Sequence, residues 1–207
     1  MWRVPAFVVA CHARAPDSAA LPFGQSNAAN SVRGRHSSGP AVTWFHAGRC
    51  YAAADPLPGA TGTGGSVWSR LGDRLIASGR YRQVVFAGIA ENGSEIARWA
   101  PGGDLHTRLL DSLDTLRDAG LPPTHLLWHQ GEQDMRLATD PAHYRERFDA
   151  LVTSLREHGV AAPVFVAQAT YCGGEDSAAL REVQRALVSP ARGVFAGASI
   201  PTQDSAE

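Results

Sequence analysis

The stretch Phe23-Gly24-Gln25-Ser26-Asn27-Ala28-Ala29-Asn30 decides how the rest of the chain is interpreted. It places a serine between a glycine and two amide side chains. Glycine permits a sharp turn that lifts a side chain off the end of a strand, and asparagine can hydrogen-bond such a turn or begin a helix. We therefore expect a strand over residues 19–23, although Pro22 removes one hydrogen-bond donor from it. Taken alone, the stretch is equally consistent with an ordinary polar loop.

Two further polar blocks follow apolar runs that are typical of buried strands. The first is Gly88-Ile89-Ala90-Glu91-Asn92-Gly93-Ser94-Glu95-Ile96, with Trp99 close behind it. The second is Trp128-His129-Gln130-Gly131-Glu132-Gln133-Asp134. Ligands of parallel sheets bind beyond the carboxyl ends of the strands. Because each block directly follows a strand, we expect Ser26, Gly93 and Gln130 to converge at one edge of a parallel sheet.

Together the three blocks resemble the SGNH hydrolase superfamily, and more narrowly its sialate O-acetylesterase and acetylxylan esterase branch, carbohydrate esterase family 6. That branch is marked by a G-Q-S-N serine block, a glycine block ending in S-x-I-x-x-W, and a W-H-Q-G-E block, and all three occur here in order. The resemblance runs from about Phe23 to the C-terminus. It implies serine-dependent hydrolysis of O-acetyl esters on carbohydrates, with a small-molecule or polysaccharide acetyl ester as substrate and no cofactor.

The resemblance also implies roles for single residues. A serine hydroxyl needs an adjacent base, and attack on an ester creates an oxyanion that preorganised donors must stabilise. The implied nucleophile is Ser26, and the implied donors are its backbone N–H, the backbone N–H of Gly93 and the side-chain amide of Gln130. Gln133 is an alternative amide, because residues 131–134 can be laid over the superfamily's G-x-N-D. Trp99 is expected to line the pocket or pack in the core.

Glu132 is the implied acid of the site. In the esterase branch this glutamate is thought to orient the catalytic histidine, the usual task of the acid in a serine triad. A structural salt bridge or loop hydrogen bond is the alternative for Glu132, and Asp134 could serve a similar structural purpose. His129 precedes Gln130 at a strand end, and alternation along a strand turns the two side chains to opposite faces. We therefore do not expect His129 to be the base.

The family's last block, an Asp-x-x-His that supplies the catalytic histidine, does not occur in the sequence. We therefore expect the chain to be C-terminally incomplete just upstream of that block. The alternative function is a catalytically impaired relative that binds acetylated sugar without turnover.

Length and composition limit the remaining possibilities. The chain has 207 residues, 44% hydrophobic and 19% charged, with a net charge of −1. These values are typical of one globular domain, which we assign to residues 21–207. We expect no nucleic-acid partner, because there is no basic stripe, and no membrane span, because no apolar run approaches about 20 residues. No ligand pattern suggests a metal site.

Cysteines and the N-terminus allow fewer conclusions. Cys11, Cys50 and Cys172 lie far apart and form no C-x-x-C pair, and we expect buried or inert thiols, with at least one unpaired. Residues 1–20 contain Arg3 followed by a short apolar run, which partly resembles a secretory signal although Pro5 interrupts it. Secretion or a periplasmic location would follow if this segment is a signal, and the localisation is otherwise unknown.

Strands and helices are expected to alternate along the rest of the chain. Residues 31–63 are rich in Gly, Ser, Ala and Pro and are expected to form a long loop. Helices are expected over residues 65–78, 105–119, 140–159 and 177–188, and strands over 81–90, 124–129, 163–167 and 193–198. This alternation predicts an α/β fold of three α/β/α layers with a flavodoxin-like parallel sheet.

Overall fold

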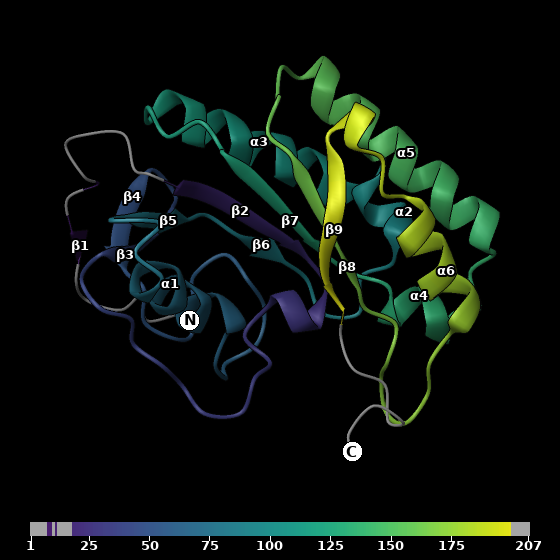
Figure 1. Cartoon of the computed structure of the whole chain (residues 1–207), viewed down its shortest axis with the longest axis horizontal. Helices are drawn as coiled ribbons and strands as arrows, with labels where there is room; N and C mark the ends of the chain where they lie inside the picture. Colours follow the sequence, from purple (N-terminus) through teal and green to yellow (C-terminus); the bar gives the residue numbers. More distant parts are fainter. Residues whose placement is uncertain (1–7, 10, 12–17, 200–207) are drawn as a thin grey trace.

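The computed structural model describes residues 8, 9, 11 and 18–199, and these form a nine-stranded sheet in the order β1-β4-β3-β5-β2-β7-β8-β9, with β6 also paired to β2 (Figure 1). The strands are β1 (Val8–Val9), β2 (Ser18–Gly24), β3 (Val42–His46), β4 (Arg49–Ala52), β5 (Val84–Phe86), β6 (Ile89–Ala90), β7 (His125–His129), β8 (Val164–Gln168) and β9 (Val194–Ser199). The helices are α1 (Val67–Ala77), α2 (Ile96–Trp99), α3 (Asp104–Asp118), α4 (Glu132–Arg136), α5 (Pro141–Glu157) and α6 (Ala178–Ala186), with short 3₁₀ turns η1 (Ser26–Ala28) and η2 (Pro190–Arg192).

The central strand of the sheet is β2, which carries the serine block at its end. It runs parallel to β5 and β6 on one side and to β7 on the other. Strands β8 and β9 continue the parallel arrangement beyond β7, and only β4 pairs antiparallel with its neighbours β1 and β3. The prediction of an α/β fold with a mostly parallel sheet is confirmed. Its carboxyl edge therefore brings the ends of β6, β2 and β7 side by side.

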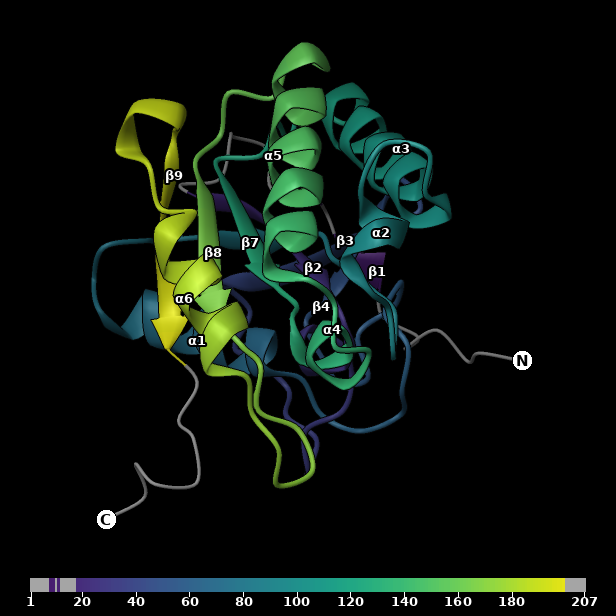
Figure 2. The same cartoon turned by 90° about the vertical axis from the view of Figure 1, so that its right-hand side faces the viewer.

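Helices cover both faces of this sheet, as predicted (Figures 1 and 2). One buried cluster joins the strands to α2, α3, α5 and α6, and Phe23, Trp99 and Trp128 pack against one another at its centre. The other cluster joins the opposite face to α1, around Trp68 and Phe86. Residues of β2 alternate between the two clusters, because successive side chains of a strand point to opposite faces.

The proline in the central strand is accommodated by an interruption in the neighbouring strand. Alternate residues of a parallel strand bond to the same neighbour. On the β5–β6 side, Ala20 O accepts from Ala87 N and Gly24 O accepts from Glu91 N, both at 3.0 Å. Pro22 lies between these two bonds, opposite the break that separates β5 from β6. The missing donor thus falls where no regular ladder is formed.

The expectation of a long loop over residues 31–63 is wrong in part, because β3 and β4 form a hairpin there. The connecting turn consists of Ala47 and Gly48, both with positive φ, 48° and 75°. Such a turn matches the twist of the flanking strands, but Ala-Gly lacks the Asn-Gly signal that would reveal it in the sequence. Residues 42–45 are all buried, so the strand also shows no alternation of polar and apolar side chains.

The other predicted helices and strands are confirmed to within a few residues, and their capping explains why. The side chains of Ser66, Asp140 and Ser177 accept hydrogen bonds from the first-turn amides of α1, α5 and α6. Two short helices, α2 and α4, were not predicted. Both begin within the second and third polar blocks, and neither is long enough to show a periodic apolar face.

The cysteines differ from expectation at two of three positions. Cys11 and Cys50 form a disulfide with a Cα–Cα distance of 5.2 Å, next to the pairing of β1 with β4, so the prediction of inert thiols is wrong for them. Cys172 is a free, half-buried thiol. The candidate signal over residues 1–20 lies largely outside the described residues. Within this segment, Ser18–Ala20 belong to β2.

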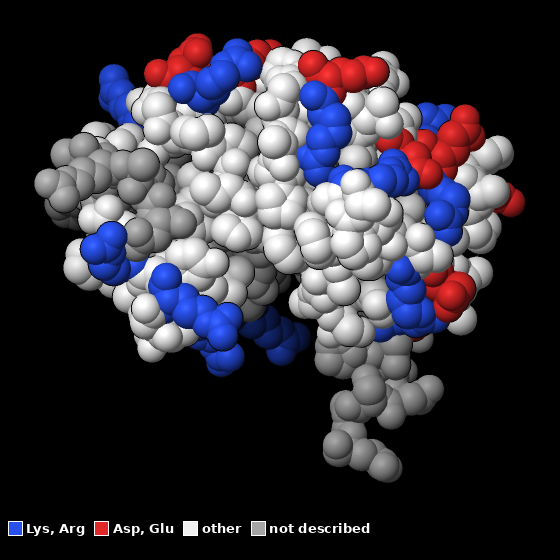
Figure 3. Space-filling view, turned by 45° about the horizontal axis from the view of Figure 1, so that its top comes forward, with Lys and Arg blue, Asp and Glu red and all other residues white. Residues whose placement is uncertain are grey.

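Charged side chains of both signs lie next to one another over the helical side of the molecule (Figure 3). Several of them pair, among them Arg98 with Asp104 and Arg192 with Asp149, each at 2.6 Å. No helix in the described part of the chain combines the length and the apolar composition that crossing a membrane requires.

Candidate active site

The serine block forms a tight turn at the carboxyl end of β2. Gly24 has a φ of +140°, and a Cβ at this position would lie 2.0 Å from His129 O, so only glycine fits against the end of β7. Gln25 N then donates to His129 O at 3.1 Å. Ser26 follows as the first residue of η1 and is half-buried. Its hydroxyl and its backbone N–H make no hydrogen bond to the described residues, so both remain free for a ligand.

The glycine block forms the loop after β6, beside the serine block. Gly93 is exposed and has a φ of +66°. Asp134 Oδ2 accepts from Ile96 N at 2.8 Å, which ties this loop to α4. The Trp99 ring is fully buried and its indole N–H donates to Ser94 Oγ at 3.0 Å. Trp99 therefore packs in the core and anchors the loop, one of the two roles expected for it.

The side chain of Gln130 is buried and directed at protein acceptors. Its Nε2 atom lies 3.0 Å from Ser94 O and 3.3 Å from Gln25 Oε1, and it also donates to Asp134 Oδ2. A primary amide has two hydrogens, so in this arrangement none is left for an oxyanion. Gln130 braces three segments rather than facing the exterior, which weakens its expected role as a donor.

Gln133 is the amide that remains free. It is half-buried in the first turn of α4, and its side chain makes no hydrogen bond to the described residues. A Cβ built on Gly93 would lie 3.9 Å from Gln133 Oε1, so the amide is next to the glycine loop. This geometry favours the alternative overlay of residues 131–134 on G-x-N-D.

Glu132 is buried beside the serine turn, with 1% of its surface exposed. Its Oε1 accepts from Asn27 Nδ2 at 2.6 Å and lies 3.6 Å from His129 Nε2. Its other carboxylate oxygen has no hydrogen-bond partner among the described residues. Since Asn27 is the neighbour of Ser26, the carboxylate lies within the serine block's surroundings and not in a remote salt bridge.

No histidine of the described residues hydrogen-bonds to Ser26. His36 and His158 pair with aspartates, at 2.7 and 2.8 Å, on the surface of the molecule. The His129 ring is directed away from Gln130, as alternation predicts, and lines a largely apolar cavity of ≈ 320 Å³ together with Trp68 and Leu127. Its Nε2 has no hydrogen bond to the described residues beyond the 3.6 Å approach to Glu132.

Burial raises the pKa of two groups in the polar network. Burial raises the pKa of Asp134, and hydrogen bonds from Gln130 and Ile96 partly oppose this. Burial also raises the pKa of Tyr144, which stays a neutral hydroxyl and donates to Gln130 O at 3.2 Å. In the described part of the chain, no group of three or more His, Cys, Asp or Glu side chains could hold a metal ion.

The solved structures that share this fold include the following three. A protein from Arabidopsis thaliana has a TM-score of 0.74 and 20% identity, over 91% of this chain and 89% of its own. NanS has a TM-score of 0.55 and 17% identity, over 74% and 68%. A carbohydrate acetylesterase from Xanthomonas citri has a TM-score of 0.57 and 19% identity, over 90% of this chain and 52% of its own. At such identities the likeness concerns the fold alone.

The sequence comparison is more specific than the structural one. No curated protein matches the chain. The family model described as "Carbohydrate esterase, sialic acid-specific acetylesterase" matches residues 23–204, which is most of the chain. The chain therefore belongs to the carbohydrate esterase, sialic acid-specific acetylesterase family.

Proposed function

We propose that Ser26 is the nucleophile with which this carbohydrate O-acetylesterase cleaves acetyl esters of sialic acid or xylan sugars. In the first step the Ser26 oxygen bonds to the acetyl carbonyl carbon, its proton passes through a base to the sugar oxygen, and the sugar alcohol leaves. Water then cleaves the acetyl-serine to acetate and regenerates the hydroxyl. The observation that carries the proposal is the 2.6 Å hydrogen bond from Asn27 to Glu132, because it holds a buried carboxylate beside the serine turn.

The oxyanion donors of the proposal are the backbone N–H groups of Ser26 and Gly93 and the side-chain amide of Gln133. Gln133 replaces Gln130 in this role because its amide hydrogens are not committed to protein acceptors. Each such donor contributes about 10²- to 10³-fold in rate in comparable enzymes. Gln130 keeps an indirect role, through its bonds to Ser94 and Asp134.

Glu132 is proposed to orient the imidazole that takes the proton of Ser26. Among the described histidines, His129 is the one that approaches Glu132, at 3.6 Å, and is therefore the first to substitute. Because no described histidine hydrogen-bonds to Ser26, a second candidate function is retention of acetylated sugar without turnover.

Release of acetate from O-acetylated N-acetylneuraminic acid and from acetylated xylo-oligosaccharides tests the proposal. Removing a triad member of a serine hydrolase costs orders of magnitude in kcat, so Ser26→Ala should lower kcat by about 10³-fold or more. A Ser26→Ala variant with unchanged kcat would exclude the serine mechanism. His129→Phe tests whether His129 is the base. A loss of kcat as large as that of Ser26→Ala would assign the base to His129, and a smaller loss would assign it to another group.

Calorimetry with the same acetylated sugars separates the two functions. Binding without detectable acetate release by the unaltered chain would support the second candidate. A serine-directed fluorophosphonate gives an independent reading, because only an activated Ser26 should be labelled quickly.

A further inference from the structure

We infer that Gln25 is a positioning residue for ester hydrolysis: it fixes the first turn of α4, and with it Gln133 and Glu132, against Ser26. The inference rests on the proposed function. Gln25 precedes the nucleophile, is buried, and touches neither a ligand nor the reacting atoms in the proposed mechanism. It acts through the residues that it holds.

A single oxygen of Gln25 gathers three donors from the third block. Gln25 Oε1 accepts from Gln133 N at 2.9 Å, from Gly131 N at 3.2 Å and from Gln130 Nε2 at 3.3 Å. The backbone of Gln25 is itself bonded to the end of β7, through His129 O. The serine turn and the start of α4 are therefore joined through one buried amide.

The start of α4 needs this support from another segment. A helix leaves its first N–H groups without intrahelical partners, and a side chain at the N-cap usually accepts one of them. The N-cap of α4 is Gly131, which has no side chain to do so. Gly131 is also fixed as glycine, because it has a φ of +149° and its Cβ would lie 2.3 Å from Ala169 O. Gln25 thus supplies in space the cap that position 131 cannot.

The two neighbours of the nucleophile both bind this turn. Gln25 holds Gln133 N, and Asn27 holds the Glu132 carboxylate at 2.6 Å. Helix α4 spans five residues, and a helix of that length is not stable by its own hydrogen bonds. The position of the proposed oxyanion amide relative to Ser26 therefore depends on contacts from the serine block. A displacement of about 1 Å at such a site can cost about 10²-fold in rate.

A double-mutant cycle on kcat tests this inference. Gln25→Met keeps the side-chain volume but removes the amide oxygen, and Gln133→Ala removes the proposed donor. We expect Gln25→Met to lower kcat by about 10- to 100-fold with KM changed less than about threefold, since the loss falls on transition-state stabilisation. If Gln25 acts through Gln133, the double variant should be about as slow as the slower single variant.

Two results would contradict the positioning role of Gln25. Multiplying losses in the double variant, or an unchanged kcat in a folded Gln25→Met protein, would overturn the inference. If Gln25→Met does not fold, Gln25→Asn takes its place in the cycle with the same two readings, because it keeps a buried amide but is one methylene shorter and withdraws the oxygen from its three donors. Asp55→Asn is the matched control: it alters a buried hydrogen-bond hub that does not contact α4, and it should lower stability while kcat per folded molecule stays unchanged.

Failure of the proposed function gives a different pattern. If Ser26→Ala keeps its activity, the serine mechanism itself is wrong. If Ser26→Ala is inactive but Gln25 and Gln133 act independently, only the positioning role is wrong.

Discussion

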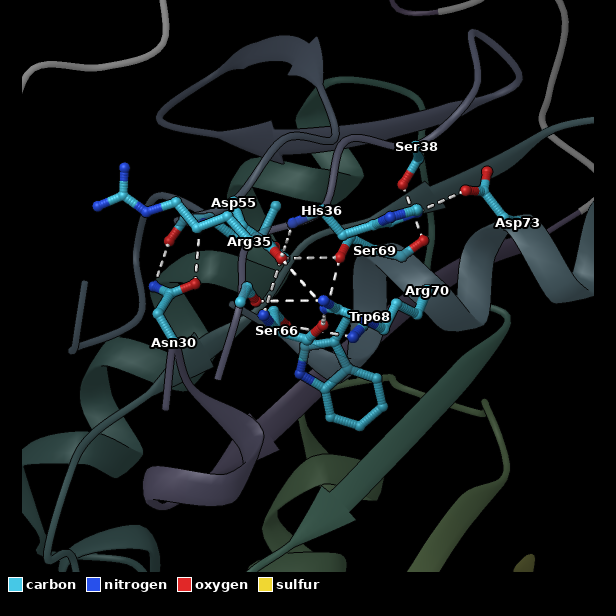
Figure 4. Close-up of polar contacts among 12 residues, drawn as sticks. Asn30, Arg35, His36, Ser38, Asp55, Ser66, Trp68, Ser69, Arg70 and Asp73 are labelled. Atoms are coloured by element: carbon cyan, nitrogen blue, oxygen red, sulfur yellow. Dashed lines mark hydrogen bonds and ion pairs between the residues drawn. The ribbon is translucent and has the colours of Figure 1, made fainter. Parts of the chain in front are cut away.

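Gln25 and Asp55 are two buried side chains that each accept hydrogen bonds from distant segments through one oxygen, and we call them hubs. Gln25 lies at the candidate site, whereas Asp55 lies in the surrounding scaffold. Asp55 Oδ2 accepts from four groups in the loop and in α1, drawn in Figure 4: His36 N, Ser66 N, Ser69 Oγ and Arg70 Nη1, at 2.9, 3.0, 3.2 and 3.4 Å. Gln25 Oε1 accepts from three groups of the third block. Both hubs connect residues more than ten positions apart, yet one is charged and the other neutral.

The difference follows from what surrounds each hub. Asp55 faces Arg70 and the N-terminus of α1, where a negative charge is stabilised. Gln25 lies at the start of α4, close to the buried carboxylates of Glu132 and Asp134 and to the place where the proposed reaction develops an oxyanion. A carboxylate at position 25 would add repulsion there. A neutral amide supplies the same acceptor without that cost. We therefore regard Asp55 as a hub that stabilises the fold and Gln25 as a hub that fixes the geometry of the candidate site.

Removing the charged hub should have the largest effect on stability. Asp55→Ala leaves the backbone N–H groups of His36 and Ser66 without their acceptor, whereas Ser69 Oγ and Arg70 Nη1 keep their bonds to Ser66 O. An unsatisfied donor typically costs about 1–3 kcal/mol, so we expect a loss of about 2–6 kcal/mol of unfolding free energy. Urea denaturation measures the loss. Asp73→Asn, which breaks the partly exposed His36 pair, is the control and should cost less than about 1 kcal/mol. An Asp55→Ala protein of normal stability but low kcat would contradict the division between the two hubs.

The disulfide is a second tie in the same half of the molecule. It joins residues 39 positions apart, and closing a loop of that size typically contributes about 2–4 kcal/mol. We expect Cys50→Ser to lower the urea midpoint correspondingly, with kcat per folded molecule unchanged. Cys172→Ser, which alters the free thiol, should leave the midpoint where it is. A loss of activity without a loss of stability would instead connect β4 to the site.

Substitutions of residues around Gln25 should have smaller effects on stability and on kcat. The Tyr144 hydroxyl donates to Gln130 O and accepts from Trp128 Nε1 at 3.3 Å. Tyr144→Phe leaves Trp128 N–H without this partner, which should cost about 1–2 kcal/mol. Gln130 O keeps its bond from Gln184, so kcat should fall only severalfold. A loss of kcat as large as that of Gln25→Met would mean that the position of the third block depends mainly on Tyr144.

Much of the fold could be predicted because it depends on local signals. Asp140 followed by proline, Ser66 and Ser177 at helix starts, and the apolar run before Ala87 each determine an element without reference to the rest of the chain. The β3–β4 hairpin escaped prediction because its Ala-Gly turn and its uniformly buried strand carry no such signal.

The site was predictable to the level of blocks but not of side chains. Three blocks that follow strands are expected at one edge, and β6, β2 and β7 are indeed neighbours. Which of two glutamines offers a free amide depends on acceptors from other segments, Ser94 O and Asp134 for Gln130. The Asp55 hub likewise joins loop residues whose spacing in the sequence is irregular. Only three-dimensional packing shows these contacts.

The smallest expected effect concerns pH and tests the desolvation of the third block. Because burial raises the pKa of Asp134 above its usual value of about 4, the folded protein binds its proton more tightly than the unfolded chain does. By linkage, this residue's contribution to stability is fully present below pH 4 and is lost as the pH rises through the raised pKa. Asparagine does not titrate at position 134. The unfolding free energy of Asp134→Asn relative to that of the unaltered protein should therefore increase with pH across that window, by up to about 1.4 kcal/mol for each unit by which the pKa of Asp134 is raised.

Urea titrations of both proteins between about pH 2 and pH 7, on both sides of the ordinary carboxyl pKa of about 4, measure that difference. Asp104→Asn is the matched control, because a hydrogen bond from Arg98 lowers the pKa of Asp104. Its stability difference should move the opposite way, decreasing as the pH rises toward the ordinary carboxyl pKa from below. A difference for Asp134→Asn that also decreases with pH would mean that the donors from Gln130 and Ile96 outweigh burial. Asp134 would then be a second charged hub like Asp55, and the neutrality of Gln25 would be needed all the more.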